Sequence, residues 1–376
     1  MDRHLHIVSL NVPWPADCGG SIDMMNRIKE FKKTGIRIHL HYFSGIDRCI
    51  PNELNQFCES IHVYKRKTSK KGEAFRLPDI LSSGINDELV ANLQKDEYPV
   101  LLEGIHCTGV LQYLNAKKRK IVVRMHNEES LYYKELTRHE HGLFKKIFFL
   151  NKSRFLKKYN HLLPDDCMYA CVSEKDIKIL KDEFHLSHVV FIPTFSSWQK
   201  VSGQEGVGTM CLYHGNLSVP ENEKAALWLL RNVFTKVRVP FVIAGKEPSK
   251  CIEKMAHLCQ HTCLVANPSE TEMNDLIKKA HINVLPCFNK NITGIRLKLL
   301  HALYEGRHCV VNKSMVEGTG LDGACHIGGN ADGFASIILQ LYHQPYSEEE
   351  IKLRKRLLSH TYNNEENTMK FIQYLW

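Results

Sequence analysis

The sequence lacks any hydrophobic run that approaches the about 18 consecutive apolar residues of a transmembrane helix. It also lacks low-complexity tracts, so we expect nearly all of its 376 residues to fold. The first predicted strand begins almost at Met1 and leaves no room for a signal peptide, which favours a cytoplasmic protein. The length exceeds what one hydrophobic core usually organises, and this predicts two domains with a cleft between them.

Standard metal-ligand patterns are scarce as well. The thirteen cysteines are odd in number and scattered, which favours reduced thiols over disulfides. The densest histidine and cysteine group is His257, Cys259, His261 and Cys263, whose spacing matches no standard zinc pair and favours a helix end followed by a loop. No Asp-x-Asp follows a predicted strand. We therefore predict no metal site.

The net charge of +9 is concentrated in two basic clusters, within residues 117–120 and 145–158. The clusters have no interleaved stacking aromatics and no known nucleic-acid-binding signature, so we expect no nucleic-acid partner. An anionic membrane surface is a candidate partner, because a polybasic face gains about 1 kcal/mol per residue near such a surface. The protein would then lie at the inner face of the membrane. The alternative is a solvated helix face.

Short apolar runs alternate with longer amphipathic stretches, a βαβ rhythm that is typical of parallel, doubly wound sheets. In the first half we predict strands at 4–10, 37–43, 60–63, 100–103, 120–124, 168–173 and 189–193, with helices that include 21–34 and 143–159. A linker rich in Ser, Gly and Gln follows at 194–208. The second half has strands at 209–214, 241–244, 262–265, 282–286 and 308–312, and helices at 222–233, 270–280 and 296–304. The pattern predicts two Rossmann-like domains, at 1–195 and 209–361.

Neither half has Gly-x-Gly-x-x-Gly directly after its first strand, which counts against NAD or FAD as a cofactor. A long loop follows the first strand instead, and Gly19 and Gly20 stand at the start of the next helix. Glycines permit a close backbone approach, and the free amides of a helix N-terminus suit phosphate or sugar oxygens. The alternative is a turn with a glycine cap.

Polar residues crowd the end of the predicted strand 120–124, which is followed by His126, Asn127, Glu128 and Glu129 and itself ends in Arg124. A buried strand needs only one polar residue to start the loop that follows, so this number of polar residues exceeds the structural need. Ligands bind at the carboxyl edge of open α/β sheets. We therefore predict a functional site there. Glu103 ends the neighbouring predicted strand. Its role is open between an acceptor-binding carboxylate, a general base and a solvated acid in a loop.

The second half carries corresponding glycine-containing segments after its first two strands, and Gly294 precedes the predicted helix 296–304. Arg296 and Lys298 lie on the first turn of that helix. A cation at a helix N-terminus costs about 0.3–1 kcal/mol unless an anion compensates it. Free amides, the helix dipole and two cations together predict a diphosphate site.

These segments together resemble the glycosyltransferases with the GT-B fold, in particular retaining, family-4-like transferases and a bacterial branch of sugar or mannosyl transferases. The resemblance covers almost the whole chain. Its marks are Pro15-Ala-Asp17-Cys-Gly19-Gly20, Arg124-Met-His126-Asn127-Glu128, and residues 172–176, 214–217, 244–248 and 294–306, followed by 310–312. It implies two Rossmann-like, doubly wound α/β domains facing a central cleft, with a last helix at 362–376 that crosses back to the first domain.

The resemblance also implies roles for individual residues. Gly19 and Gly20 would approach the donor phosphates, His126 would lie near the transferred sugar, and Arg296 and Lys298 would neutralise the diphosphate leaving group. Glu103 is the second catalytic candidate because its strand ends beside that of His126. The predicted donor-binding set also contains Gly215, Asn216, Gly245, Lys246, Gly294, Arg296, Lys298 and His301. The predicted acceptor-side set is Asp17, Arg124, Asn127 and Glu128. Thr293 and His301 replace the family's usual pair of glutamates, and Asn216 replaces an arginine, so the donor nucleotide stays open between UDP and GDP.

The activity implied is transfer of a hexose from a nucleotide-diphosphate sugar to a glycan or lipid-linked acceptor, with retention of configuration. Arginine, lysine and helix amides would stabilise the departing diphosphate in place of a metal, and no cofactor is expected. Two alternatives remain. One is a GT-B-fold nucleotide-sugar 2-epimerase, and the other is a catalytically inert relative that binds glycans or partners.

Overall fold

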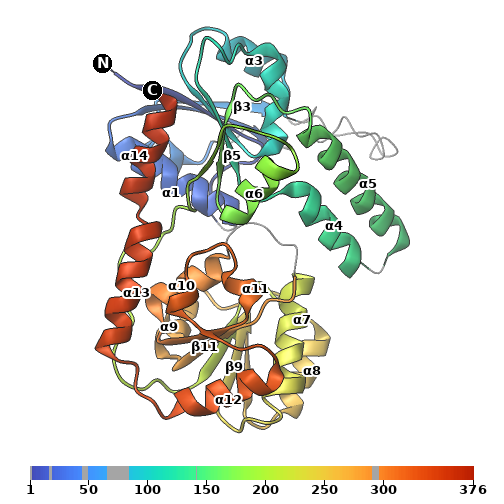
Figure 1. Cartoon of the computed structure of the whole chain (residues 1–376), viewed down its shortest axis with the longest axis vertical. Coiled ribbons are helices and arrows are strands. Elements are labelled where there is room, and N and C mark those ends of the chain that lie inside the picture. The colour runs from blue at the N-terminus through green and yellow to red at the C-terminus, as the bar shows by residue number, and fades with distance from the viewer. Residues whose placement is uncertain (1, 17–18, 45–49, 66–83, 141, 290–295) are drawn as a thin grey trace. The chain divides into compact units, whose positions relative to one another are not determined.

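A computed structural model describes residues 2–16, 19–44, 50–65, 84–140, 142–289 and 296–376 (Figure 1). The chain divides into two compact units. Unit 1 comprises Met1–Ser197 and Tyr362–Trp376, and unit 2 comprises Trp198–Lys290 and Arg296–Thr361. No helix of the described residues combines the length and the apolar character that a membrane span requires.

Unit 1 is built on a seven-stranded sheet in the order β3-β2-β1-β4-β5-β6-β7, and every pairing in it is parallel. The strands are β1 (His4–Ser9), β2 (Arg37–Ser44), β3 (Ser60–Lys65), β4 (Val100–Glu103), β5 (Ile121–Met125), β6 (Met168–Cys171) and β7 (Val189–Phe191). The helices are α1 (Gly19–Lys33), η1 (Asn52–Leu54), α3 (Asp87–Leu93), η2 (Ile105–Tyr113), α4 (Glu129–His139), α5 (Leu143–Asn160), α6 (Glu174–Asp182) and α14 (Asn364–Leu375).

The central strands of unit 1 are buried on both faces, which explains their continuous apolar runs. Val8, Leu102 and Val123 belong to the hydrophobic cluster on one face of the sheet. Leu101 and Val122, which are their neighbours in sequence, belong to the cluster on the other face. This alternation follows from the two-residue period of a strand, and it fixes the register of the sheet.

The C-terminal helix α14 packs within unit 1. Phe371 is fully buried in the same cluster as Phe31 of α1, and the two rings meet edge to face with centroids 5.9 Å apart. Asn364 holds the start of α14 to the chain after β7, because its side chain bonds both the amide and the carbonyl of Ser196. The last helix therefore supplies part of the core beneath β1 and α1.

Unit 2 contains a six-stranded sheet in the order β10-β9-β8-β11-β12-β13, again with parallel pairings. Its strands are β8 (Cys211–His214), β9 (Phe241–Gly245), β10 (Thr262–Ala266), β11 (Ile282–Leu285), β12 (His308–Val311) and β13 (His326–Ile327). Its helices are α7 (Pro220–Trp228), η3 (Leu229–Val233), α8 (Lys250–Leu258), α9 (Glu270–Lys279), α10 (Leu297–Glu305), α11 (Lys313–Val316), η4 (Asp322–Ala324), α12 (Ala331–Tyr342) and α13 (Glu348–Thr361).

The predicted fold class, two doubly wound parallel α/β sheets, is confirmed. Strand β13 was not predicted, because two residues are too few to show a period. In each sheet the strand order reverses beside the first strand, between β1 and β4 in unit 1 and between β8 and β11 in unit 2. Open α/β sheets bind ligands outside the carboxyl ends of the strands at such reversal points.

Candidate active site

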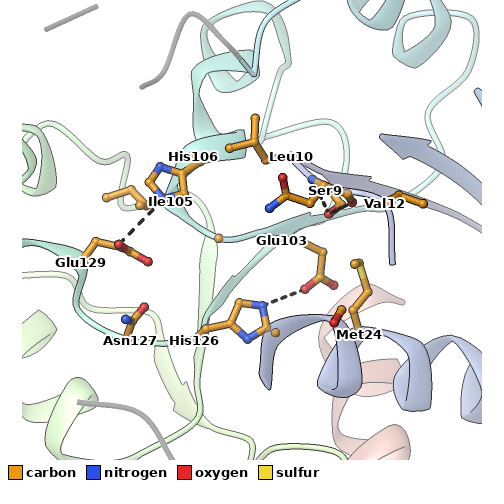
Figure 2. A pocket seen from close by; sticks show the side chains of 14 residues that line it. Ser9, Leu10, Val12, Met24, Glu103, Ile105, His106, His126, Asn127 and Glu129 are labelled. Atoms are coloured by element: carbon orange, nitrogen blue, oxygen red, sulfur yellow. Dashed lines mark hydrogen bonds and ion pairs between the residues drawn. The ribbon is translucent and has the colours of Figure 1, made fainter. Parts of the chain in front are cut away.

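A cavity of about 350 Å³ lies at the carboxyl ends of β1, β4 and β5, at the reversal point of the unit 1 sheet (Figure 2). Its volume falls in the range of small-molecule sites, about 300–1,000 Å³. The side chains that line it come from the ends of these strands, from the loops that follow them and from the start of α1. They include Ser9, Asn11, Met24, Glu103, His106, His126, Asn127 and Glu129.

His126 and Glu103 form a hydrogen-bonded pair in this cavity, and Figure 2 shows the two side chains pointing toward each other. His126 Nε2 lies 3.2 Å from Glu103 Oε2, and the imidazole is 27% exposed. Burial alone would raise the pKa of Glu103, but Arg27 and the bond from His126 lower it. Glu103 is therefore a carboxylate that accepts from Nε2–H and orients the ring. Because Arg27 donates to Oε1 and His126 lies at Oε2, both oxygens are engaged, which favours an orienting role over that of a general base.

The carboxylate of Asp23, in α1, faces the second ring nitrogen of His126. Its Oδ2 lies 3.6 Å from His126 Nδ1, and the side chain is 1% exposed. Arg27, one turn along α1, donates to Asp23 Oδ2 at 2.6 Å and also to Glu103. Arg124 donates to both carboxylate oxygens of Asp23, at 3.0 Å each. Burial would raise the pKa of Asp23, but the two guanidinium groups hold it well below its usual range.

Arg124 is fully buried and does not line the cavity. Besides Asp23, its guanidinium donates to the carbonyl oxygens of Ile192 and Pro193, at 2.5 and 2.9 Å. All of its contacts are thus internal. We revise its predicted acceptor-side role: Arg124 positions Asp23 and the chain after β7 rather than a bound molecule.

Glu128 is likewise an internal residue and is 1% exposed. Its carboxylate caps α4 by accepting from the amides of Ser130 and Leu131, at 3.1 and 2.7 Å, and it also accepts from Asn160 at 2.6 Å. An N-cap carboxylate is stabilised by the free amides of the first turn. The predicted acceptor-side role of Glu128 is therefore revised to helix capping, whereas Asn127 beside it lines the cavity.

Glu129 and His106 form a second polar pair in the cavity. The sequence predicts Glu129 as part of a functional segment without giving it a role, and it does not identify His106. Glu129 Oε2 lies 3.8 Å from His106 Nε2 (Figure 2). Burial and the neighbouring Glu128 raise the pKa of Glu129 to about 7, although Lys152 opposes the shift. A carboxyl group with this pKa exchanges its proton near neutral pH, as acid–base groups in active sites do.

Gly19 and Gly20 are the first two residues of α1, and Gly20 lines the cavity. A Cβ built on Gly20 meets no atom within 4 Å, so no protein atom requires a glycine there. Asp17 lies outside the described residues, as do Thr293 and Gly294.

In unit 2 the start of α10 carries Arg296 and Lys298 close to the reversal point between β8 and β11. Lys298 Nζ lies 2.8 Å from Asn222 Oδ1 and 3.4 Å from the hydroxyl of Tyr213, which is in β8. Arg296 forms an ion pair with Glu221 at 2.5 Å. Burial and the nearby Arg296 lower the pKa of Lys298 to about 8. Arg296 and Lys298 thus have only Glu221 as a nearby carboxylate among the described residues. The net positive charge at this helix N-terminus favours the binding of an anion.

Two further side chains of unit 2 adjoin this helix. His301 stacks on Trp198 with ring centroids 4.2 Å apart, and its Nε2 bonds Asn274 Oδ1 at 2.6 Å. Burial lowers the pKa of His301 to about 4. His214, at the end of β8, is buried, and its Nε2 has no hydrogen-bond partner among the described residues. Buried polar atoms normally have a hydrogen-bond partner, so this nitrogen at the carboxyl edge of the sheet is available to a bound molecule.

The remaining predicted donor residues lie at the ends of β8 and β9. A Cβ on Gly245 would stand 1.9 Å from the carbonyl oxygen of Gly215, so Gly245 is a glycine because the two backbones approach closely. Asn216 closes the turn before α7 by accepting from the amide of Ser218 at 3.0 Å. Lys246 is exposed after β9. Both Gly245 and Asn216 thus have local structural roles.

Asp23, Glu103 and His126 also have their possible ligand atoms within 4.8 Å of one another, a spacing that a metal ion could fit. Both carboxylates already accept from guanidinium groups, and the two arginines balance their charge. A divalent cation would add uncompensated positive charge to this buried network. The arrangement is better suited to holding His126.

Asp23 and Arg27 were not selected from the sequence, although a signal was present. They stand four residues apart, in line with Phe31, on the face of α1 that is buried. A carboxylate and a guanidinium on a buried helix face require partners from other elements. That requirement could have identified them as part of a network.

No protein-family model matches the chain. An uncharacterized 44.6 kDa protein in the cps region of Klebsiella pneumoniae is 25% identical over a 334-residue alignment, and the match covers 84% of this chain and 84% of that protein. The crystal structure of TarM from S. aureus matches with a TM-score of 0.71 at 12% identity, covering 100% of this chain and 99% of TarM. Sucrose-phosphate synthase from Thermosynechococcus elongatus matches with a TM-score of 0.70 at 11% identity, covering 99% and 98%. These likenesses show that the chain has the GT-B fold, whereas the narrower resemblance to family-4-like transferases stays a prediction.

Proposed function

We propose that this protein is a glycosyltransferase that moves a hexose from a nucleotide-diphosphate sugar onto a glycan or lipid-linked acceptor. The observation that carries the proposal is the pair of polar sites at the reversal points of the two sheets. One holds an oriented histidine in a small-molecule cavity, and the other presents two cations at a helix N-terminus. The fold shared with TarM and sucrose-phosphate synthase supports it.

The donor diphosphate is proposed to bind at the start of α10 in unit 2. Arg296, Lys298 and the free amides of the helix N-terminus would contact its oxygens, and the unpartnered Nε2 of His214 would gain a partner. A TarM variant has been solved in complex with UDP, which supports a uridine donor, while GDP remains to be compared.

The cavity of unit 1 is proposed to bind the reacting sugar and the acceptor hydroxyl. His126, held by Glu103 and Asp23, would contact the sugar, and Asn127 would offer its amide to hydroxyl groups. Glu129, with a pKa of about 7, would bind a hydroxyl group either as donor or as acceptor. This mixture of amide, imidazole and carboxyl groups suits a carbohydrate better than an apolar ligand.

The proposed reaction breaks the bond between the anomeric carbon and the diphosphate oxygen, and forms a bond from the acceptor oxygen to the same carbon. Negative charge develops on the departing diphosphate, where Arg296 and Lys298 stabilise it electrostatically without a metal. In the retaining course implied by the family resemblance, the acceptor proton passes to that departing phosphate. Glu103, whose pKa is lowered, is left to orient His126.

A lipid-linked acceptor is supported by α5. Leu143 and Phe144 at its start are 69% and 81% exposed, and Lys145 and Lys146 follow directly. Exposed apolar residues next to lysines bind the headgroup region of anionic membranes. The double variant Leu143→Ser/Phe144→Ser should therefore lose co-sedimentation with phosphatidylserine vesicles. Leu258→Ser, at a 65% exposed position in unit 2, should bind vesicles as the wild type does.

The proposed activity is tested by incubating the full chain with single UDP- and GDP-sugars, with and without a membrane extract as acceptor source. Thermal stabilisation reports binding, because a ligand at 100 times its Kd adds about 2.7 kcal/mol. Lys298→Met should lose the stabilisation, whereas Lys236→Met, at an exposed lysine of the same unit, should retain it. His126→Ala should still bind the nucleotide sugar but lose most transfer.

Three other outcomes would each revise the proposal in a different way. Conversion of the sugar nucleotide to an isomer without acceptor would identify an epimerase. Binding of a sugar nucleotide without product from any acceptor extract would identify an inert relative. Full transfer by His126→Ala would remove the histidine from the reaction while leaving the transferase proposal intact.

A further inference from the structure

Three side chains of unit 2 converge at the amino edge of its sheet, away from the carboxyl edge that carries Lys298. His308 is the first residue of β12, His326 is the first residue of β13, and Glu350 lies in the first turn of α13. Their ligand atoms all lie within 4.8 Å of one another. None of the three residues belongs to the sites described above.

The hydrogen bonds of His308 fix which of its ring nitrogens carries the proton. Nε2 lies 3.0 Å from the carbonyl oxygen of Gln344, which can only accept, so Nε2 carries the hydrogen. Nδ1 is buried, has no hydrogen-bond partner among the described residues, and lies 3.2 Å from Glu350 Oε1. In the neutral ring with its hydrogen on Nε2, Nδ1 carries a lone pair, and this lone pair faces the carboxylate.

The neighbouring His281 shows how a buried histidine of this sheet is satisfied when no ion is needed. Its Nε2 lies 2.8 Å from the carbonyl oxygen of Leu341, and its Nδ1 accepts from the amide of Gly208 at 3.1 Å. Both ring nitrogens are therefore used. At His308 the second ring nitrogen faces a carboxylate instead, so either a proton or a metal cation must lie between the two groups.

The two carboxylate oxygens of Glu350 have different partners. Oε2 accepts from the amide of Ser347 at 3.0 Å and caps α13. Oε1 faces both imidazoles, at 3.2 Å from His308 Nδ1 and 3.7 Å from His326 Nε2. The adjacent Arg354 directs its guanidinium to the carbonyl oxygens of Gly306 and Arg307, at 2.8 and 2.7 Å.

We propose that His308 Nδ1, His326 Nε2 and Glu350 Oε1 bind a zinc ion. Two imidazoles and one carboxylate are a common zinc ligand set, and Zn–N and Zn–O bonds of about 2.0–2.2 Å place tetrahedral ligand atoms roughly 3.3–3.5 Å apart. The observed separations of 3.2 and 3.7 Å bracket that value. His308 is fully buried, whereas His326 and Glu350 are 38% and 28% exposed, so the fourth position faces solvent.

Such an ion would have a structural role. β13 has only two residues and pairs with β12 through Val310 and Val311, so little holds this edge strand by itself. The zinc would join β12, β13 and α13 at the edge of the sheet opposite the proposed donor site. The inference does not depend on the proposed glycosyltransferase activity.

The test is titration of metal-free, full-length protein with zinc chloride in competition with a chromophoric chelator. We expect one equivalent to bind, and Glu350→Gln and His326→Ala to weaken that binding at least tenfold. The matched controls are Glu349→Gln and His343→Ala, at exposed positions nearby, which should bind zinc as the wild type does. Glu350→Gln suits this purpose because its amide oxygen can still cap α13 while its NH2 faces His308.

Thermal unfolding separates a metal site from a plain ion pair. If zinc binds there, zinc chloride raises the Tm of the wild type but not of Glu350→Gln, and the metal-free variant is at least as stable as the metal-free wild type. If His308 and Glu350 are only an ion pair, Glu350→Gln is less stable and zinc shifts neither protein. That result, or equal zinc binding by wild type and Glu350→Gln, overturns the inference.

Discussion

Replacing Asp23 by asparagine should destabilise unit 1 strongly, although the two side chains have the same shape. Asp23 is 1% exposed, and each of its oxygens accepts bonds from at least two donors, among them Arg27, Arg124 and the amide of Phe195. In either orientation, the NH2 of an asparagine would face at least one guanidinium N–H donor. The substitution also leaves two buried guanidinium groups with Glu103 as their one remaining carboxylate.

The size of the effect follows from the charge that is left over. Removing one partner of a buried ion pair costs about 3–5 kcal/mol, because the other charge stays buried without compensation. For a unit of this length, a loss of 1 kcal/mol lowers the Tm by about 2–4 °C, so a decrease of about 6–20 °C is expected. The control is Asp2→Asn, whose ion pair with Arg37 is exposed and should leave the Tm unchanged.

Differential scanning calorimetry of the full chain is the assay, with the transition of unit 2 as an internal reference. In Asp23→Asn/Arg27→Met one positive charge is removed with the negative one. The double variant should be more stable than the sum of the single effects by about 0.5–3 kcal/mol. The pKa of Asp23 is depressed in the folded protein, so its contribution is present above about pH 4 and is lost below. A Tm of Asp23→Asn equal to that of the wild type, or strictly additive effects, would refute the reasoning.

Two further predictions concern Glu129 and Phe371. The pKa of Glu129 is raised to about 7 on folding, so the folded state holds this proton more tightly than the unfolded state does. The wild type should therefore lose stability relative to Glu129→Gln as pH rises from about 4.3 to 7, at no more than about 1.4 kcal/mol per pH unit. Urea unfolding across that pH range measures the difference. A difference independent of pH would contradict this. Phe371→Ala should cost unit 1 about 3–5 kcal/mol in the same assay, since the buried ring also lies against Arg27 and Arg124. Met369→Ala, at a 49% exposed position of the same helix, is its control, and equal losses would show that this face of α14 is not packed as described.

The fold could be predicted because its signals are local and repeated. The central strands β4 and β5 are short runs of mostly apolar residues, and β4 begins and ends where the sequence predicts. Helix α5 likewise starts at the predicted residue. Boundaries shift where hydrogen bonds decide them: β6 stops at Cys171 because the hydroxyl of Ser173 caps α6. Periodicity contains no information about such a cap.

The candidate site was predictable only in part. Sequence reasoning can place His126 and Glu103 at one sheet edge, because parallel strands end together. It cannot tell a side chain that faces a cavity from one that faces the core. Arg124 and His126 are separated by one residue, yet the first is fully buried and the second is 27% exposed. Whether a charged residue binds a ligand or another buried charge depends on partners remote in sequence, such as Asp23.

These partners also explain why the last helix matters to the site. Phe371 of α14 lies 5.3 Å from the guanidinium carbon of Arg27 and 5.5 Å from that of Arg124, both measured to its ring centroid. The same arginines fix Asp23 and Glu103, the carboxylates that face the two ring nitrogens of His126. The orientation of His126 thus depends on a residue 245 positions later in the chain, through side chains that are buried except for the partly exposed imidazole itself. In unit 1, paired carboxylates and guanidinium groups thus hold the histidine that lines the cavity, and the aromatic ring of Phe371 packs against the same guanidinium groups.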